Sequence, residues 1–161
     1  NDIWALRQEG AIDAVLENAD CGIVLMHMQR DPLTMQFNPE YRNVVSEVMQ
    51  FLEDRANLLI SKGIDPNRIA LDPGFGFGKS LEHNVEMLAK FDSFSEAGYP
   101  VLAGISRKSM LGKITGKEAD QRLAPSISAA VIAADRGARI IRVHDVPETV
   151  DALKLWEAVN T

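Results

Sequence analysis

Cysteine is almost absent from this chain, which contains a single such residue, Cys21. One cysteine excludes an internal disulfide and a cysteine-based zinc site, and it predicts a reducing, cytoplasmic location. Long apolar runs are lacking too, since no stretch approaches the ~20 apolar residues of a membrane span and no signal-peptide pattern opens the chain. We therefore expect no membrane partner, and we expect Cys21 to pack at the start of a strand.

Positive charge is also scarce. Lysine and arginine number 17 against 23 aspartate and glutamate residues, so the net charge is −6. This balance argues against nucleic acid or an anionic membrane as a partner. The 161 residues, of which 46% are hydrophobic, are enough for one domain with a real core. Because no shift in composition divides the chain, residues 1–161 are predicted to be a single domain.

Apolar runs typical of buried strands alternate along the chain with amphipathic stretches of helical period. The predicted strands cover residues 22–26, 69–71, 100–105 and 139–144. The predicted helices cover residues 12–18, 41–62, 81–97 (with Ser80 as N-cap) and 126–136, and a last helix runs to about residue 159. About four complete β-loop-α units therefore follow a remnant of another. This order predicts an α/β fold with a parallel sheet and helices outside it.

Polar and ionisable residues come directly after each predicted strand. They are His27, Asp72, Lys108, Arg142 with His144, and Asn1 in the remnant that precedes the first complete unit. In parallel α/β folds the carboxyl ends of the strands form the ligand site. Five units that place polar groups on the same rim are hard to explain by packing alone. The rim is therefore the predicted functional site.

The stretch of residues 69–80 is the most distinctive part of this rim. Its strand delivers Asp72 to the tip, Pro73 ends the strand because proline has no N–H, and three glycines then alternate with two phenylalanines. A phosphate-binding P-loop is excluded because its first glycine would fall on Pro73, and the G-x-G-x-G spacing does not fit a dinucleotide fingerprint. An acid, close backbone and flat rings indicate a planar ligand with polar edges. A glycine-rich loop with no chemistry is the alternative.

The histidines differ in what their positions indicate. His27 and His83 are predicted to be structural, with His83 facing solvent from a helix. His144 lies two residues from Arg142 on a predicted strand, so the two side chains would share a face and form an anion site.

Other candidates keep two interpretations each. Arg107 and Lys108 are either a solvated basic pair or part of an anion site, because residues 106–109 open a helical region whose free N–H groups favour negative charge. Met26, Phe75 and Phe77 are equally consistent with core packing and with a ligand wall.

Four motifs together resemble the dihydropteroate synthase family of bacterial folate biosynthesis. They are residues 26–29 (MHMQ), 71–79 (LDPGFGFGK), 104–109 (GISRKS) and 142–146 (RVHDV), and the similarity covers essentially the whole chain. The family fold is a TIM (β/α)₈ barrel of about 250 residues or more. The resemblance is to its C-terminal portion, so we expect an incomplete barrel that lacks the first three strands, most of the fourth, and two mobile N-terminal loops.

The resemblance implies a reaction in which 7,8-dihydropterin-6-ylmethyl diphosphate condenses with 4-aminobenzoate and releases diphosphate, a step that sulfonamides target. Asp72, Lys108 and Arg142 would be the catalytic residues. The pterin would contact Asn1, Met26, Asp72, Phe77, Gly104, Lys108 and Arg142. The diphosphate would contact Asn1, Arg142 and His144, and the aminobenzoate would contact Ser109 and Phe77. Asp72 would accept the pterin's amino and ring N–H groups, Lys108 would meet ring acceptors, and Arg142 would stack beside the ring.

The resemblance also implies a Mg²⁺ cofactor whose protein ligand lies in the missing N-terminal part, and a homodimer in the full-length family. Pro125 departs from the family pattern, which usually has a glycine nearby, and leaves the local start of a helix open. Two other functions compete with the synthase: a pterin-binding methyltransferase dependent on methyltetrahydrofolate, and a catalytically inactive pterin-binding fragment. The isolated chain is expected to be weakly active or inactive.

Overall fold

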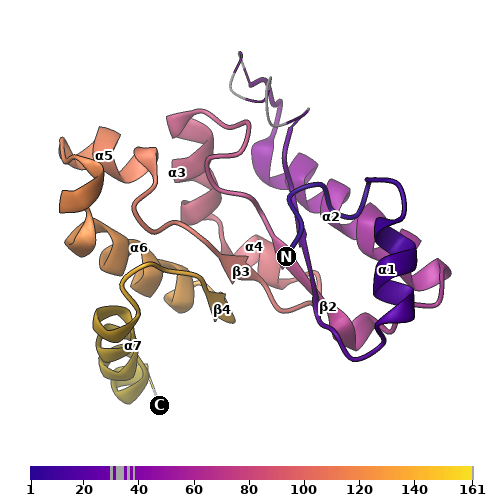
Figure 1. Ribbon diagram of the computed structural model, residues 1–161. Coiled ribbons are helices and arrows are strands. Elements are labelled where there is room, and N and C mark those ends of the chain that lie inside the picture. The colour runs from indigo at the N-terminus through magenta and orange to yellow at the C-terminus, as the bar shows by residue number, and fades with distance from the viewer. Residues whose placement is uncertain (30, 32–34, 36, 38, 161) are drawn as a thin grey trace.

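The computed structural model describes residues 1–29, 31, 35, 37 and 39–160 (Figure 1). Its strands are β1 (Ile23–Met26), β2 (Ile69–Asp72), β3 (Leu102–Ala103) and β4 (Ile140–Ile141), in that order along the chain. β1 pairs with β2 and β3 with β4, both in parallel. Single parallel bridges, Asp2 to Leu25 and Leu71 to Val101, extend this order on one side and join the two pairs. The predicted α/β architecture with parallel strands is confirmed.

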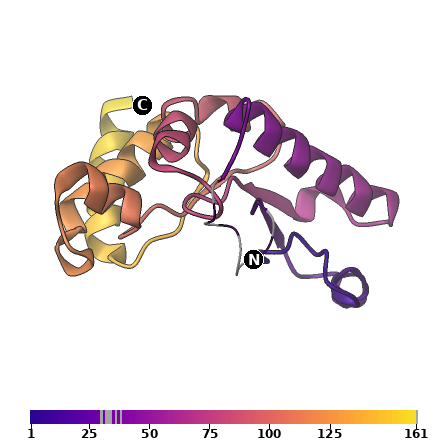
Figure 2. The ribbon, with the colours of Figure 1, turned by 90° about the horizontal axis from the view of Figure 1, so that it is seen from above.

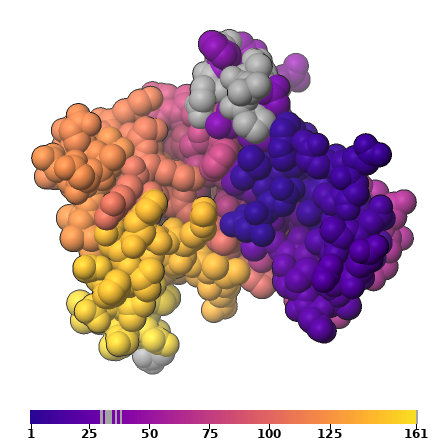
Figure 3. All heavy atoms as spheres, in the orientation of Figure 1, coloured from indigo at the N-terminus to yellow at the C-terminus, as the bar shows by residue number. Residues whose placement is uncertain are grey.

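Helices connect and follow these strands. They are α1 (Ala11–Glu17), α2 (Val44–Ser61), α3 (Leu81–Ala89), α4 (Asp92–Ser95), α5 (Ser109–Thr115), α6 (Leu123–Asp135) and α7 (Val146–Asn160), with short 3₁₀ turns at Pro66–Arg68 and Ala119–Gln121. Seen from above, α2 and α3 lie along one side of the strands and the N-terminus lies on the other (Figure 2). The whole molecule forms an open arc, and a notch separates the N-terminal segment from the C-terminal helix on the face in Figure 3.

The core lies between β1, β2 and the apolar face of α2. Leu25 and Leu71 are fully buried beside α2 residues such as Leu52, at the spacing expected of an amphipathic helix. A cluster of aromatic rings extends this core. The ring of Phe75 stacks on that of Phe91, with centroids 6.2 Å apart and planes 12° apart. Phe75 is therefore a core residue, which settles one of the alternatives left open by the sequence.

Local capping explains where α2 and α3 begin. The side chain of Asn43 accepts a hydrogen bond from the Ser46 N–H, and Glu47 accepts from the backbone N–H groups of Arg42 and Asn43. Ser80 caps α3 as predicted. His83 completes that cap, since its Nδ1 accepts the Ser80 N–H at 3.2 Å, and its side chain is half-buried where the sequence predicted a solvent-facing one.

Several predicted boundaries are wrong for tertiary reasons. The single helix predicted over residues 81–97 is broken between α3 and α4, where Phe91 turns into the aromatic cluster. The strand predicted over 139–144 ends at Ile141, and its last ladder bond is donated by the Arg142 N–H to the Ala103 carbonyl at 3.0 Å. The strand predicted over 100–105 is likewise reduced to Leu102–Ala103.

Cys21 differs from its prediction, and the effect of Pro125, which the sequence left open, is now clear. Cys21 is exposed rather than packed, and its sulfur lies 3.3 Å from Nη2 of Arg68. Pro125 lies in the first turn of α6, where its missing N–H leaves no intrahelical bond unmade, so the helix forms normally around it. In the described part of the chain, no helix has both the length and the apolar character needed to cross a membrane.

Candidate functional site

A pocket of about 190 Å³ lies at the carboxyl ends of the strands. Its lining residues are Asn1, Ile3, Met26, Asp72, Phe77, Gly104, Lys108 and Arg142. Every residue that the resemblance assigns to the pterin is in this set, and segments far apart in the sequence each contribute to it. Ile3 is the one lining residue that was not predicted. The sequence offered one hint of its role: Ile3 lies two residues from Asn1 in a segment that pairs with β1 through Asp2, so the two side chains can share a face.

Asp72 is the buried acid of this pocket. It ends β2 opposite Met26 on β1, and its side chain is 5% exposed. Burial raises the pKa of the Asp72 carboxyl, whereas the N–H of Gly74, which donates to Oδ1 at 2.8 Å, and the charges of Lys108, Lys79 and Arg142 lower it. Asp72 thus presents a carboxylate to the pocket from a rigid strand end, with one oxygen already held by backbone.

The glycine loop, residues 73–78, folds against the end of β1. Gly74 has φ 70°, and a Cβ at this position would lie 2.0 Å from the carbonyl oxygen of His27. No side chain can be accommodated there. The loop directs Phe75 into the core and Phe77 to the pocket, so the alternation of phenylalanines separates a packing residue from a ligand wall.

Two buried side chains hold the glycine loop in place. Lys79 donates to Nδ1 of His27 at 2.9 Å and to the carbonyls of Gly74 and Phe77 at 2.9 and 3.0 Å. Asn84, on α3, accepts the N–H of Gly76 at 2.7 Å. The structural interpretation of His27 is confirmed. The part played by Lys79 was missed, because a lysine before an N-cap serine carries no local sign of burial.

Lys108 enters the pocket from the residue before α5. Its Nζ donates to the carbonyl of Phe75 and lies 4.8 Å from the centroid of the Phe77 ring. Burial lowers the pKa of Lys108 to about 8, an effect that Asp72 opposes and Arg142 reinforces. The cation therefore rests on the glycine loop and faces the acid of the same pocket.

Arg107 points away from Lys108, so the two are not a solvated basic pair. Arg107 has φ 57°, and its guanidinium forms a two-bond ion pair with Asp145, with nitrogen–oxygen distances of 2.5 and 3.1 Å. Its backbone N–H donates to Oγ of Ser126 at 2.9 Å. These contacts hold an unusual backbone conformation that separates the two basic side chains.

Arg142 and His144 do not share a strand face, because β4 ends before both of them. Arg142 lines the pocket. The Nδ1 atom of His144 lies 3.0 Å from the hydroxyl oxygen of Ser106 instead, and His144 is outside the pocket lining. Ser109, in the first turn of α5, is exposed and is also outside that lining. The structure thus gathers the predicted pterin set but not the rest of the predicted diphosphate and aminobenzoate sets.

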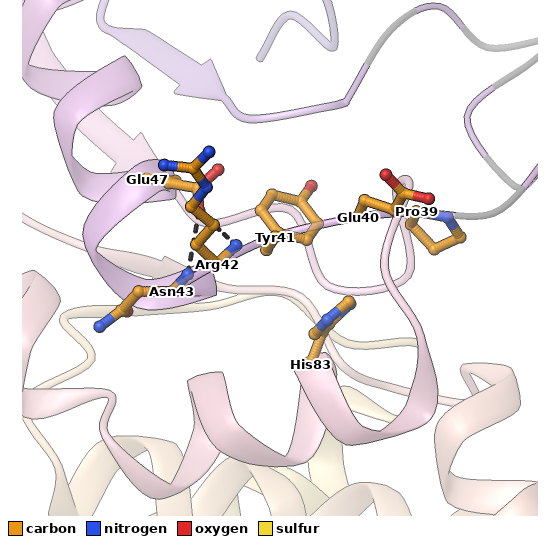
Figure 4. A pocket seen from close by; sticks show the side chains of 7 residues that line it. All are labelled: Pro39, Glu40, Tyr41, Arg42, Asn43, Glu47 and His83. Atoms are coloured by element: carbon orange, nitrogen blue, oxygen red, sulfur yellow. Dashed lines mark hydrogen bonds between the residues drawn. The ribbon is translucent and has the colours of Figure 1, made fainter.

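A second and larger cavity, of about 1020 Å³, lies where the chain enters α2 and α3 (Figure 4). Two of its polar side chains are engaged within the fold, since Glu47 caps α2 and the Tyr41 hydroxyl donates to the carbonyl of Gly78 at 2.9 Å. The rings of Tyr41 and His83 meet edge to face, 5.0 Å apart. None of the predicted site residues lines it. This hollow is a feature of helix capping rather than the predicted site.

The donor set of the pocket does not suit a metal ion by itself. Within the described residues, no group of three His, Cys, Asp or Glu side chains converges closely enough to hold one. Mg²⁺ favours several oxygen ligands, and the pocket contributes the Asp72 carboxylate and the Asn1 amide alongside two cations.

Fold and pocket together define a class: an α/β protein with a small pocket at the carboxyl ends of parallel strands, whose lining suits a flat molecule with polar edges. A buried acid, an aromatic wall and two cations are the features that a conjugated heterocycle with N–H and carbonyl edges would use.

The chain belongs to the pterin-binding enzymes: the family model described as "Pterin binding enzyme" matches residues 1–144. It is 52% identical to the dihydropteroate synthase of Neisseria meningitidis serogroup C, over 99% of this chain and 57% of that protein. It is 48% identical to the Haemophilus influenzae enzyme, over 98% of this chain and 57% of that protein. The resemblance to dihydropteroate synthase is therefore confirmed, and the chain spans little more than half the length of these curated relatives.

Solved structures give the same answer. The Yersinia pestis dihydropteroate synthase, in complex with a sulfonamide drug, superposes with a TM-score of 0.96 at 42% identity, over 99% of this chain and 58% of that one. The Xanthomonas albilineans enzyme in complex with 7,8-dihydropteroate superposes with a TM-score of 0.93 at 49% identity, over 100% of this chain and 58% of that one. The same enzyme has been solved with 4-aminobenzoic acid.

Proposed function

We propose that this chain is the pterin-binding, C-terminal portion of a dihydropteroate synthase, and that it forms one single, partial domain of a TIM (β/α)₈ barrel. One observation carries the proposal: the residues that the family resemblance assigns to the pterin, from Asn1 to Arg142, line one small pocket at the strand ends. The relatives are synthases, which favours this function over methyl transfer from methyltetrahydrofolate.

The pocket would recognise the dihydropterin ring by its edges and faces. Asp72 would accept hydrogen bonds from the amino group and a ring N–H, a pairing that a carboxylate makes well. Lys108 would donate to ring acceptors on the opposite edge, since its Nζ faces Asp72 across the pocket. Phe77 and Arg142 offer flat surfaces to the ring faces. A volume of about 190 Å³ suits one ring system rather than the whole product.

The proposed reaction forms one bond and breaks another at the methylene carbon beside the pterin ring. The amine nitrogen of 4-aminobenzoate bonds to that carbon, the carbon–oxygen bond to the diphosphate breaks, and its electron pair leaves with the diphosphate. The amine then loses a proton to water. Positive charge grows on the pterin-methylene unit during departure, so the nearby Asp72 carboxylate stabilises it, while a cation such as Arg142 stabilises the leaving group.

The outer part of the site is proposed from the resemblance. The diphosphate would lie against Asn1, Arg142 and His144, and the aminobenzoate against Phe77 and Ser109. The Nδ1 atom of His144 contacts the Ser106 hydroxyl at 3.0 Å, so Nε2 is the ring nitrogen that would meet the diphosphate. Mg²⁺ on the diphosphate would supply further charge neutralisation when bound, with its protein ligand outside this chain.

The proposed assembly is a homodimer, and the proposed location is the cytoplasm. An apolar groove of about 560 Å³ between α3, α5 and α6 supports the dimer, because Val85, Ile114 and Ile132 are more than one-third exposed along it. A second copy of the chain is the occupant proposed for this groove.

The function is tested by supplying the part of a synthase that this chain does not cover. The chain would be joined to the uncovered segment of the Neisseria meningitidis relative, and formation of 7,8-dihydropteroate would be measured by chromatography. We expect synthase activity from the chimera, weak or no activity from the chain alone, and a loss of kcat/KM of about 100-fold or more in an Asp72→Ala chimera. A folded chimera with no activity, or full activity after Asp72→Ala, would contradict the proposal.

A further inference from the structure

Lys79 is a buried amine that the proposed chemistry leaves unused. Burial lowers its pKa to about 7, an effect that the charge of Asp72 opposes, so below neutral pH it is an ammonium. Its side chain is 5% exposed, and it lies one residue beyond the glycine loop. The ammonium has three N–H bonds and three close acceptors: Nδ1 of His27 at 2.9 Å, the Gly74 carbonyl at 2.9 Å and the Phe77 carbonyl at 3.0 Å. All of its donors are therefore matched by acceptors, as a buried ammonium requires.

His27 is a rigid acceptor for this ammonium. Its backbone N–H donates to the carbonyl of Asp72 at 2.9 Å, which locks the residue to the end of β2. Its ring packs edge-on against Phe51, with centroids 5.0 Å apart. Because Nδ1 accepts from Lys79, the neutral ring carries its proton on Nε2. Burial first, and the charge of Lys79 second, lower the pKa of His27 to about 2, which keeps the ring neutral.

The ammonium of Lys79 joins two walls of the pocket. The Gly74 carbonyl belongs to the peptide next to the N–H that holds Oδ1 of Asp72, and the Phe77 carbonyl belongs to the residue whose ring lines the pocket. Asn84 and Tyr41 hold the glycine loop from the helix side, through Gly76 and Gly78. Lys79 is the side chain that ties this loop to β1 through His27.

We propose that Lys79 is a positioning residue of the pocket: with His27 as its fixed acceptor, it holds the glycine loop in the conformation that presents Asp72 and Phe77 to the ligand. The inference rests on the proposed function for the identity of that ligand as a pterin. Lys79 itself does not line the pocket, so it acts through the loop.

The experiment uses two substitutions at His27 that differ in one acceptor. The oxygen of asparagine can occupy the place of Nδ1 and accept from Lys79, whereas leucine cannot. Affinity for 6-hydroxymethyl-7,8-dihydropterin would be measured by calorimetry with the full chain, for His27→Asn, His27→Leu, Lys79→Met and the exposed control Lys154→Met. We expect Kd to rise by about tenfold or more for His27→Leu and Lys79→Met, and to stay within about threefold for His27→Asn and Lys154→Met.

A second measurement needs no ligand. Hydrogen exchange of the Gly76 and Phe77 amides, which bond to Asn84 and to the Gly74 carbonyl, reports the loop conformation directly. These amides should exchange about tenfold faster or more in His27→Leu and Lys79→Met than in His27→Asn, beyond any change at the core amide of Leu71.

Pterin affinity and amide exchange together distinguish a failure of the positioning role of Lys79 from a failure of the proposed function. Equal affinities and equal loop exchange in His27→Asn and His27→Leu would overturn the role of Lys79, and this pair decides the matter even if Lys79→Met does not fold. If the unaltered chain bound no pterin, the proposed function would fail, while the exchange pattern would still support or overturn the positioning role.

Discussion

Asp72 shares its pocket with two cations, Lys108 and Arg142, and the balance of these charges decides what a substitution does. Asp72→Asn keeps an oxygen that can accept the Gly74 N–H, so the glycine loop should survive the change. Hydrogen bonds to a charged group contribute about 1.5–3 kcal/mol, so pterin affinity should fall by roughly 10- to 100-fold in calorimetry.

The control for this prediction is Asp151→Asn, which removes an exposed carboxylate from α7 and should leave affinity unaltered. Pterin binding of Asp72→Asn at the affinity of the parent chain would show that the acid does not contact the ligand.

His27 links stability to pH. The folded chain keeps its pKa at about 2, whereas the unfolded chain has the ordinary value of 6.5, so between these pH values the unfolded state binds one more proton. Stability must therefore fall as pH drops from about 6.5, by at most about 1.4 kcal/mol per pH unit from this residue. Urea unfolding at pH 7.5, 6 and 5 should show a steeper loss for the parent chain than for His27→Asn, which lacks the titrating group.

The pH prediction has a clear contrary result. Parallel pH profiles for the parent chain and His27→Asn would mean that the folded imidazole takes up its proton as readily as the unfolded one.

At the scale of elements, the glycine loop is held by backbone contact as much as by Lys79. Gly74 and Gly116 both have φ 70°, but a Cβ at Gly74 would lie 2.0 Å from the His27 carbonyl, whereas a Cβ at Gly116 would meet no atom within 4 Å. Left-handed backbone costs a residue with a Cβ about 1–2 kcal/mol. Gly116→Ala should therefore lose about 1 kcal/mol, and Gly74→Ala about 3 kcal/mol or more, in urea unfolding.

The two alanine substitutions are matched controls for each other, because the two glycines have the same φ angle. Equal losses of stability at the two positions would mean that the loop can move away from β1 without cost.

Much of this arrangement could be predicted from local patterns. Apolar runs and helical periodicity located the strands and helices, and the rule that ligands bind at strand ends identified Asp72, Lys108 and Arg142. Tertiary contacts decided the rest. The break before α4 depends on the stacking of Phe91 on Phe75. The side chains of Arg107 and Lys108 separate because Arg107 forms an ion pair with Asp145. A sequence read locally contains no information about such distant partners.

At the scale of the molecule, the strands make an arc rather than a closed ring, and the helices cover its outer side (Figures 1 and 2). Such an arc has two open edges, and unpaired strand edges favour further association. The outer helices also leave apolar surface uncovered in the groove between α3, α5 and α6. Two kinds of surface can therefore drive association, and a substitution confined to the groove can distinguish them.

Self-association through this groove can be tested with two isoleucines of nearly equal exposure. Ile132 lines the groove and is 38% exposed, whereas Ile60 on α2 is 36% exposed and lies outside it. Glutamate at either position should cost similar stability, but only Ile132→Glu places a charge in the proposed interface, where a desolvated charge without a partner is strongly unfavourable. Sedimentation velocity should therefore find dimers for the parent chain and Ile60→Glu, and monomers for Ile132→Glu. If both variants remained dimeric, the groove would not be the dimer interface.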